Sequence, residues 1–240
     1  MSRWTTTTVR DIIQETPNTK RIWLAFPEDF SLEYKAGQFI VAELPIHEKR
    51  TQRWRSYSIA NAPDGSQCIE LCVVKLEGGK GSTYLCDALQ KGDTLKIKRP
   101  QGVFTLPDNL EGKELIFVCT GTGIAPFRAM LQSLYAENKL FDKAHLIFGT
   151  RRSTGILYKE ELETLSGSHA NFDYSVCLSR ESIHPFHKGY VHAIYEKEYA
   201  QPQSNRHFYL CGWSNMVDEA TQRLKSLGYR DKQIHVELYG

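Results

Sequence analysis

A short segment, Arg55-Ser56-Tyr57-Ser58, lies within the stretch RWRSYSIANAP and combines a cation, an aromatic ring and two hydroxyl groups. If the segment is a β-strand, Arg55 and Tyr57 lie on one face and Ser56 and Ser58 on the other. An edge strand with solvated charges has the same composition. This segment alone therefore does not identify a ligand.

A second segment is rich in glycine and follows an apolar run. In LIFVCTGTGIAPFRAMLQSLY, residues 120–123 separate a predicted buried strand from a predicted amphipathic helix, whose first turn contains Pro126. Glycines at the carboxyl end of a strand let backbone N–H groups and a helix N-terminus approach a phosphate. Pro126 occupies the position of the third small residue of G-x-G-x-x-G. A tight strand-to-helix turn is the alternative interpretation.

The composition is that of a globular protein. The chain has 240 residues, of which 41% are apolar and 24% charged, enough for one large domain or two ordinary ones. Its net charge of +2 gives no reason to expect a nucleic acid or another polyanion as partner. The beginning MSRWTTTTVRD shows no secretion leader, and no apolar run is long enough to cross a bilayer. We therefore expect a cytoplasmic protein.

Cysteines and histidines give no sign of a metal site. The six cysteines lie mostly in apolar, strand-like runs and are expected to be buried thiols. No pair has the two-residue spacing of zinc or redox sites, and no four are spaced for an iron–sulfur cluster. His184 and His187 lie beside a proline and are interpreted as loop residues. We predict no bound metal.

The chain changes its pattern once. From Val9 to about Leu106, short alternating or β-branched runs between turn residues predict an antiparallel β-barrel or sandwich. After PDNLEGKE, apolar runs alternate with stretches of helical spacing, which predicts an α/β doubly wound parallel sheet. Pro, Asp, Asn and Gly cluster near residues 107–113. We therefore expect two domains, residues 1–109 and 110–240.

Over essentially its whole length the sequence resembles the plant-type ferredoxin–NADP(+) reductase family, through seven motifs in the family's order. Residues 55–58 are similar to the flavin motif Arg-x-Tyr-Ser, residues 79–82 to Gly-x-x-Ser, and residues 120–126 to the pyridine-nucleotide loop. The other four motifs are ILYKEEL, CLSRES, YLCGWSNM and the terminal HVELYG. The last departs from the family pattern, because Gly240 follows the terminal aromatic. The resemblance implies a flavin-binding barrel domain, a nucleotide-binding α/β domain and no fused iron–sulfur domain.

The resemblance also implies what the first segment binds. Arg55 would pair with the flavin pyrophosphate, Tyr57 would stack on the isoalloxazine, and Ser58 would lie at its N5 edge. Ser82 and Thr83 would offer hydroxyl and N–H groups to the same pyrophosphate, which favours FAD over FMN. The implied flavin-binding residues are Arg55, Ser56, Tyr57, Ser58, Cys72, Val73, Val74, Gly79, Lys80, Gly81, Ser82, Thr83 and Tyr239.

The implied catalytic set consists of Ser58, Cys211, Glu237 and Tyr239. Cys211, followed by Gly212, would contact the nicotinamide, and Glu237 would help to relay protons. Tyr239 would be the aromatic lid that covers the flavin and moves aside for the nicotinamide. A core thiol, an exposed edge-strand carboxylate and a frayed terminus are the alternatives for these three residues.

The choice of nucleotide depends on the 2′-phosphate of NADP(H), which needs cations and hydroxyls at the ends of the second and third strands. Arg151 follows the run HLIFG, and Ser179 and Arg180 follow YSVCL. These residues favour NADP(H) over NAD(H), although solvated loop arginines are the alternative. The expected nucleotide-binding residues are Thr120, Gly121, Thr122, Gly123, Ile124, Ala125, Pro126, Arg151, Ser179, Arg180, Cys211 and Gly212, with Arg152, Tyr158, Lys159, Lys188 and Tyr190 as additions.

The resemblance implies a flavoprotein oxidoreductase that transfers hydride between NADP(H) and FAD, and single electrons between FAD and ferredoxin or flavodoxin. One alternative is the NAD(P)H-dependent reductase component of an oxygenase. Another is a flavin-carrying electron-transfer subunit of a larger complex. Lys49, Arg50 and Arg53 precede the flavin strand and are candidates for steering an acidic redox partner, with a solvated basic loop as the alternative. We expect a monomer.

Overall fold

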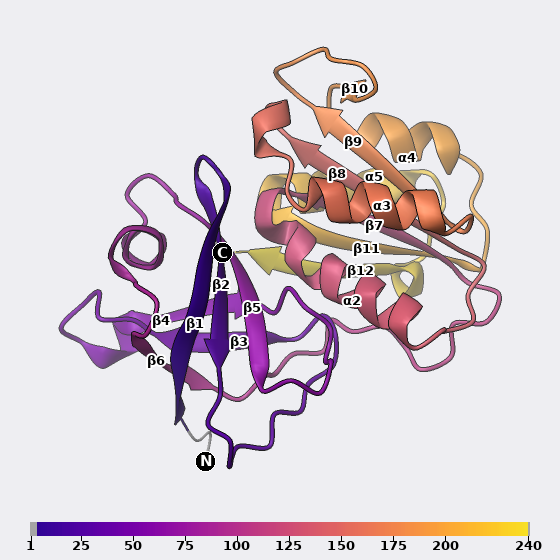
Figure 1. The fold of residues 1–240 in the computed structure, drawn as a ribbon. Coiled ribbons are helices and arrows are strands. Elements are labelled where there is room, and N and C mark those ends of the chain that lie inside the picture. The colour runs from indigo at the N-terminus through magenta and orange to yellow at the C-terminus, as the bar shows by residue number, and fades with distance from the viewer. Residues whose placement is uncertain (1–3, 240) are drawn as a thin grey trace. The chain divides into compact units, whose positions relative to one another are not determined.

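The computed structural model describes residues 4–239, which divide into two compact units (Figure 1). The first comprises the residues up to Leu106 together with Ala125–Glu137. The second comprises Pro107–Ile124 and the residues from Asn138 onward. Each unit contains one sheet of six strands.

The sheet of the first unit is antiparallel and closes into a barrel. Its strand order is β4-β3-β6-β1-β2-β5, and a bridge between Ile59 and Leu71 joins the two ends of the sheet. The strands are β1 (Trp4–Thr16), β2 (Thr19–Ala25), β3 (Phe39–Glu43), β4 (Trp54–Ser58), β5 (Cys68–Val74) and β6 (Thr94–Lys98). Alternating apolar side chains such as Ile22 and Leu24 fill the interior. The predicted antiparallel domain is therefore confirmed.

Two helical segments accompany the barrel. Helix α1 (Lys80–Thr83) continues into one π-helical turn, Tyr84–Ala88, where the sequence STYLCDAL indicates a helix. Helix α2 (Ile124–Ala136) packs its apolar face on the barrel, and the ring of Phe127 lies 5.9 Å from that of Phe104. This helix therefore groups with the first unit, although it directly follows the glycine loop of the second.

The sheet of the second unit is parallel throughout, in the order β10-β9-β8-β7-β11-β12. Its strands are β7 (Glu114–Thr120), β8 (Lys143–Thr150), β9 (Phe172–Leu178), β10 (His187–Lys188), β11 (Arg206–Trp213) and β12 (Ile234–Tyr239). The helices are α3 (Lys159–Ser168), α4 (His192–Glu198) and α5 (Ser214–Ser226). Strand order reverses between β7 and β11, where doubly wound sheets bind nucleotides. The predicted doubly wound sheet is confirmed.

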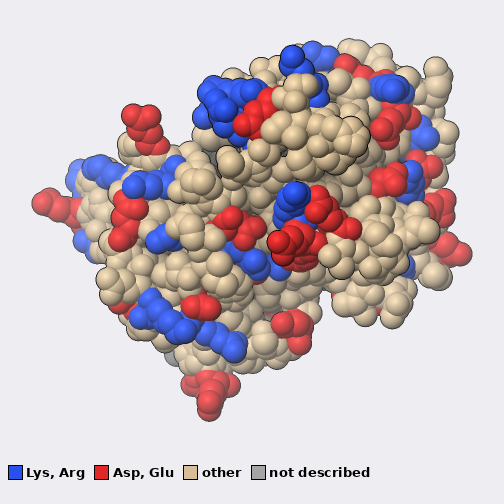
Figure 2. All heavy atoms as spheres, turned by 45° about the horizontal axis from the view of Figure 1, so that its top comes forward, with Lys and Arg blue, Asp and Glu red and all other residues tan. Residues whose placement is uncertain are grey.

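Charge and burial follow the expectations from composition. All six cysteines are buried. On the face shown in Figure 2, Lys and Arg side chains are interspersed with Asp and Glu, as the net charge of +2 suggests. Between residues 4 and 239 no helix is both long and apolar enough to span a membrane.

Candidate functional site

Strand β4 carries the first motif along one edge of the barrel sheet. It pairs with β3, which places Ile40 opposite Tyr57 and Phe39 opposite Ser58. Arg55 is exposed, Tyr57 is half-buried and Ser58 is buried. Burial raises the pKa of the Tyr57 phenol far above its ordinary value, against the opposing effect of the Arg55 charge. Tyr57 therefore presents an uncharged ring near neutral pH.

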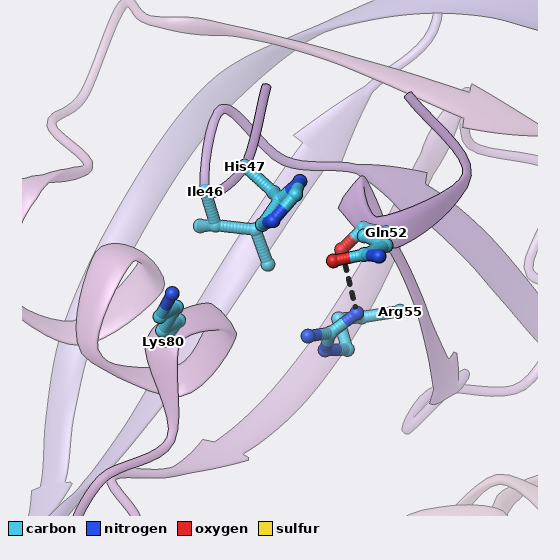
Figure 3. A pocket seen from close by; sticks show the side chains of 5 residues that line it. All are labelled: Ile46, His47, Gln52, Arg55 and Lys80. Carbon is cyan, nitrogen blue, oxygen red and sulfur yellow. Dashed lines mark hydrogen bonds between the residues drawn. The ribbon is translucent and has the colours of Figure 1, made fainter. Parts of the chain in front are cut away.

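A pocket of about 300 Å³ opens beside this strand (Figure 3). Its lining residues are Ile46, His47, Gln52, Arg55 and Lys80. Arg55 Nη1 donates to the carbonyl oxygens of Gln52 at 3.1 Å and Trp54 at 2.7 Å, which orients the guanidinium. Lys80 approaches from α1 on the other side of the pocket (Figure 3). Two cations on opposite walls suit the two phosphates of a dinucleotide.

Three residues of this pocket, Ile46, His47 and Gln52, are not among the predicted site residues. They come from the loop between β3 and β4, where PIHEKRTQ contains no recognisable motif. Arg53 shapes this loop, because its guanidinium donates to the carbonyl oxygens of His47 and Glu48. The Lys49 N–H donates to His47 Nδ1 at 2.9 Å, so neutral His47 carries its proton on Nε2. Only proximity to the Arg-x-Tyr-Ser strand could have pointed to them.

Gly81 lets α1 approach β4 closely. A Cβ at this position would lie 3.0 Å from Arg55 Cγ and 3.4 Å from Tyr57 Oη. Ser82 Oγ accepts a hydrogen bond from the Leu76 N–H and donates one to the Gly79 carbonyl, each at 3.0 Å. The Ser82 hydroxyl therefore shapes the loop around Arg55, and its predicted contact with a pyrophosphate stays a prediction. Residues 79–83 form a cradle that suits a flavin dinucleotide.

The end of β5 was predicted to line the flavin with its backbone. Cys72 and Val73 are buried and Val74 is half-buried. These three residues pair with Arg21, Lys20 and Thr19 of β2. Their contact with the flavin stays a prediction.

In the second unit, the glycine loop follows β7 as expected. Thr120 ends the strand, residues 121–123 form a 3₁₀ turn, and α2 begins at Ile124 with Pro126 in its first turn. Gly121 has a φ of +53°, which glycine adopts without strain. A Cβ at Gly123 would overlap the carbonyl group of Cys211. The loop therefore packs directly against the end of β11.

A buried hydroxyl group lies at this junction. Thr120 Oγ1 has no hydrogen-bond partner within the described part of the chain. Gly212 has a φ of +140°, and a Cβ there would lie 2.6 Å from this oxygen. The hydroxyl is enclosed by the surrounding chain, and the absence of a side chain at Gly212 lets the end of β11 pack directly onto Thr120. The position, at the reversal of strand order, fits a nucleotide.

Two of the predicted catalytic residues come together in the second unit. Cys211 on β11 is the register partner of Glu237 on β12, and Gly212 is followed by Trp213, which pairs with Tyr239. Cys211 is fully buried and Glu237 is half-buried. The backbone of Tyr239 closes β12, whereas its side chain and Gly240 lie outside what the structure describes. Ser58, the third polar residue of the predicted set, belongs to the first unit.

The arginines predicted to bind the 2′-phosphate lie at the ends of β8 and β9. The Arg180 N–H donates to the Arg151 carbonyl at 2.9 Å, so the two loops run together. Glu181 joins them, because its carboxylate accepts the Ser153 N–H at 2.7 Å and faces Arg152 Nη1 at 3.3 Å. The Ser153 N–H also holds the pKa of Glu181 below its ordinary value. This connection through Glu181 was not predicted.

The additional candidates are less closely grouped. Tyr158 is buried and adopts a left-handed conformation with φ of +52°. Lys159 Nζ lies 5.5 Å from the ring centroid of Phe186. Lys188 and Tyr190 are exposed beside β10. Nothing in these contacts assigns the four residues to a nucleotide.

Comparison with known proteins agrees with this geometry. Residues 6–106 match the oxidoreductase FAD-binding domain family, and residues 117–222 match the oxidoreductase NAD-binding domain family. A ferredoxin–NADP reductase B of Sorangium cellulosum is 36% identical, with coverage of 86% of this chain and 85% of that protein. The ferredoxin reductase component of a Rhodococcus rhodochrous 3-ketosteroid-9-alpha-monooxygenase is 28% identical over 99% of this chain, which spans 66% of its length.

The fold has a close match among solved structures. A ferredoxin NADP+ reductase from Neisseria gonorrhoeae with bound FAD and NADP superimposes with a TM-score of 0.83 at 25% identity, covering 99% of each chain. The two domain families, the extent of the Sorangium match and the fold give one conclusion. The chain belongs to the plant-type ferredoxin–NADP(+) reductase family and is an NAD(P)H-dependent flavoprotein reductase with an FAD-binding and an NAD-binding domain.

Proposed function

We propose that the protein uses NADPH in preference to NADH to reduce its FAD and passes single electrons to a small acidic redox protein such as ferredoxin or flavodoxin. The observation that carries this proposal is the Arg151, Ser179 and Arg180 group at the ends of two adjacent strands, held together through Glu181. Its support from relatives is the Sorangium match, whose name specifies ferredoxin and NADP. We propose residues 1–109 as the flavin domain and residues 110–240 as the nucleotide domain.

FAD supplies the redox chemistry, since it accepts two electrons from a nicotinamide and releases them one at a time. The residues of the chain bind and orient. Arg55 and Lys80 neutralise the pyrophosphate, and the uncharged Tyr57 ring packs against the isoalloxazine. In our proposal Ser58 donates a hydrogen bond at the N5 edge, Cys211 contacts the nicotinamide and Glu237 holds a proton nearby. Tyr239 acts as the lid.

The surface that receives the electron partner is proposed around Lys49. Arg50 faces Glu43 at 3.1 Å, and Arg53 is hydrogen-bonded to carbonyl oxygens of its own loop. Both arginines therefore already interact with groups of the chain itself, whereas Lys49 is exposed. Lys98 lies nearby in the sheet, with Nζ 4.2 Å from the ring centroid of Trp54. Lys49 and Lys98 together form a small basic surface that suits docking of an acidic protein.

A second candidate function, the reductase component of an oxygenase, is favoured by the Rhodococcus match over 99% of this chain. A flavin-carrying subunit that binds no nicotinamide is disfavoured by the match of residues 117–222 to the NAD-binding family. A cytoplasmic location and a monomeric state stay predictions.

Stopped-flow reduction of the purified holoprotein by NADPH and by NADH tests the proposal, followed by addition of ferredoxin, flavodoxin or an oxygenase component. Faster reduction by NADPH and rapid reoxidation by ferredoxin or flavodoxin are expected. Preference for NADH would contradict the nucleotide assignment. Reoxidation by the oxygenase component alone would select the second candidate.

A further inference from the structure

A buried ionic cluster connects the barrel with α2. Glu70 on β5 has a side chain only 2% exposed and lies between Arg21 of β2 and Arg128 of α2, whose side chain is 7% exposed. Arg21 holds both carboxylate oxygens, with Nε at 2.6 Å and Nη2 at 3.1 Å. Arg128 Nη1 lies 2.9 Å from Glu70 Oε2. All three residues belong to the first unit.

Arg128 also holds residues 60–62, which follow β4. Arg128 Nη1 also donates to the Ala60 carbonyl at 2.7 Å, while the Ala60 N–H donates to the Glu70 carbonyl at 2.8 Å. One helical turn further along α2, Gln132 Oε1 accepts the Ala62 N–H at 3.0 Å. Asn61, between them, accepts the Glu70 N–H at 2.7 Å. The backbone of residues 60–62 is thus fixed by two side chains of α2 and by β5.

Stability is a weak reason for such a cluster. Removing charges from water costs free energy that the attraction between them often only offsets, so apolar side chains of similar size stabilise a core at least as well. What charged hydrogen bonds add is direction, because a guanidinium shared by a carboxylate and a carbonyl allows few arrangements. The cluster therefore fits a role in fixing geometry.

The ionic cluster fixes the carboxyl end of β4, the strand that carries Arg55, Tyr57 and Ser58. Within the described residues β4 pairs along its length with β3 only, and a single bridge from Ile59 to Leu71 joins its carboxyl end to β5, so the residues that follow depend on separate contacts. Ser58 ends the strand, and Ala60 is two residues further on. We propose that Arg128 is a positioning residue for the flavin: together with Glu70 it fixes the Ala60 carbonyl and thereby the place of Ser58. The effect on catalysis rests on the proposed function.

Arg206 offers a matched control in the second unit. Its Nε lies 2.8 Å from Glu114 Oε2, and its Nη1 donates to the Gln201 carbonyl at 2.8 Å. Arg206→Met therefore removes an ion pair and a carbonyl contact of the same kind as those of Arg128, together with the contact of Arg206 with the Tyr199 ring. We expect Arg128→Met and Arg206→Met both to lose stability, which urea unfolding measures.

Of the two methionine variants, only Arg128→Met should change the surroundings of the bound flavin. In the holoprotein we expect a changed visible circular dichroism spectrum of FAD and reduction by saturating NADPH slowed about ten- to a hundred-fold, with nucleotide affinity little changed. Arg128→Lys, which keeps the charge, should recover most of the rate and the parent spectrum. Arg206→Met should keep both. A parent spectrum and parent rate in Arg128→Met would overturn the inference.

A variant that loses FAD or fails to fold needs a milder companion. Gln132→Ala removes the hydrogen bond to the Ala62 N–H and leaves Arg128 and Glu70 in place, and we expect a smaller change of the FAD spectrum in the same direction. A parent spectrum in Gln132→Ala, with Arg128→Met unfolded, would also overturn the inference. If neither nucleotide reduces the parent protein, the proposed function fails, whereas the spectra still test the position of the flavin.

Discussion

Cys211 and Glu237 are register partners on adjacent parallel strands, so their side chains leave the sheet on the same face. On the other side of β11, Cys211 pairs with Cys119 of β7, another fully buried thiol. Burial raises the pKa of Cys119 well above its ordinary value, and proximity to Cys211 adds to the rise. Cys211 is proposed to contact the nicotinamide, whereas its neighbour Cys119 has no proposed role. The effects of replacing each thiol can therefore be compared directly.

We expect Cys211→Ala and Glu237→Gln to slow flavin reduction by NADPH about a hundred-fold, because contact with the nicotinamide and proton transfer act on the reacting groups. FAD content and the unfolding midpoint should change far less. Cys119→Ala is the matched control, since it removes a buried thiol one strand away. Transient rates in Cys211→Ala no lower than in Cys119→Ala would remove Cys211 from the mechanism.

Arg55→Ala should weaken FAD binding about ten- to a hundred-fold, which corresponds to ~1.4–3 kcal/mol, because a charged hydrogen-bonding partner of the pyrophosphate is lost. Fluorescence titration of the apoprotein with FAD measures the dissociation constant. Arg50→Ala is the control, since this arginine lies outside the pocket lining and faces Glu43. Equal FAD affinity in the two variants would place the pyrophosphate elsewhere.

Arg180→Ala should raise the KM for NADPH about ten-fold and leave that for NADH nearly unchanged, since only NADPH carries the 2′-phosphate. NADH serves as the internal control in the same preparation. Glu181→Ala should raise the KM for NADPH to a smaller extent, because it releases the Ser153 N–H and loosens the two loops. A parallel rise for both nucleotides would show that Arg180 does not read the 2′-phosphate.

His145 makes the second unit sensitive to acid. The ring is 1% exposed, and its nitrogens lie 2.8 Å from Tyr199 Oη and 2.9 Å from Ser175 Oγ. Burial lowers its pKa from 6.5 to about 4, despite the opposing charge of Asp173. Between pH 6.5 and about 4, His145 is therefore protonated in the unfolded chain and neutral in the folded chain.

The stability that depends on neutral His145 is complete above pH 6.5 and is lost as the pH falls toward 4, up to about 3 kcal/mol. Urea unfolding of the parent between pH 7.5 and about 4.5 should show this loss. In His145→Gln the free energy of unfolding should fall less steeply with decreasing pH, by the equivalent of up to one proton taken up on unfolding. The variant should also be less stable than the parent at neutral pH. His184→Gln removes an exposed histidine and is the control for the substitution itself.

Much of the architecture was predictable because its signals are local. The apolar runs LIFVC, HLIFG and HFYLC become β7, β8 and β11, since a strand buried on both faces requires unbroken apolar sequence. Strand β10 has only two residues, too few for any periodic pattern. The apolar face of α2 indicates burial but does not name its neighbour, so its packing on the barrel was not predicted.

The site was predictable where residues form motifs and not where they meet across the chain. Arg55 and Gly81 could be singled out in the sequence because each belongs to a short pattern. Arg55 lines the pocket and Gly81 packs against it, and their contact with FAD stays a prediction. His47 belongs to no pattern and reaches the pocket only through the shape of its loop. Arg128 and Glu70 are separated by 58 positions, and nothing in a single sequence pairs them.

The last prediction concerns the electron partner. Lys49 is exposed, whereas Arg50 faces Glu43, so reversing Arg50 would set two carboxylates against each other and disturb the loop. Lys49→Glu is therefore the cleaner test. At low ionic strength it should slow electron transfer to ferredoxin or flavodoxin several-fold, and the difference should shrink as salt screens the charge. Reduction of FAD by NADPH should not change.

The control for net charge is Lys232→Glu, an equal charge reversal at an exposed position of the second unit. If local docking at Lys49 matters, only Lys49→Glu shows the large, salt-dependent loss, because a general change of net charge affects both variants alike. Equal rates for the two variants at low salt would place the docking surface elsewhere. The steepness of the salt dependence in the parent then measures how many charges the real surface contributes.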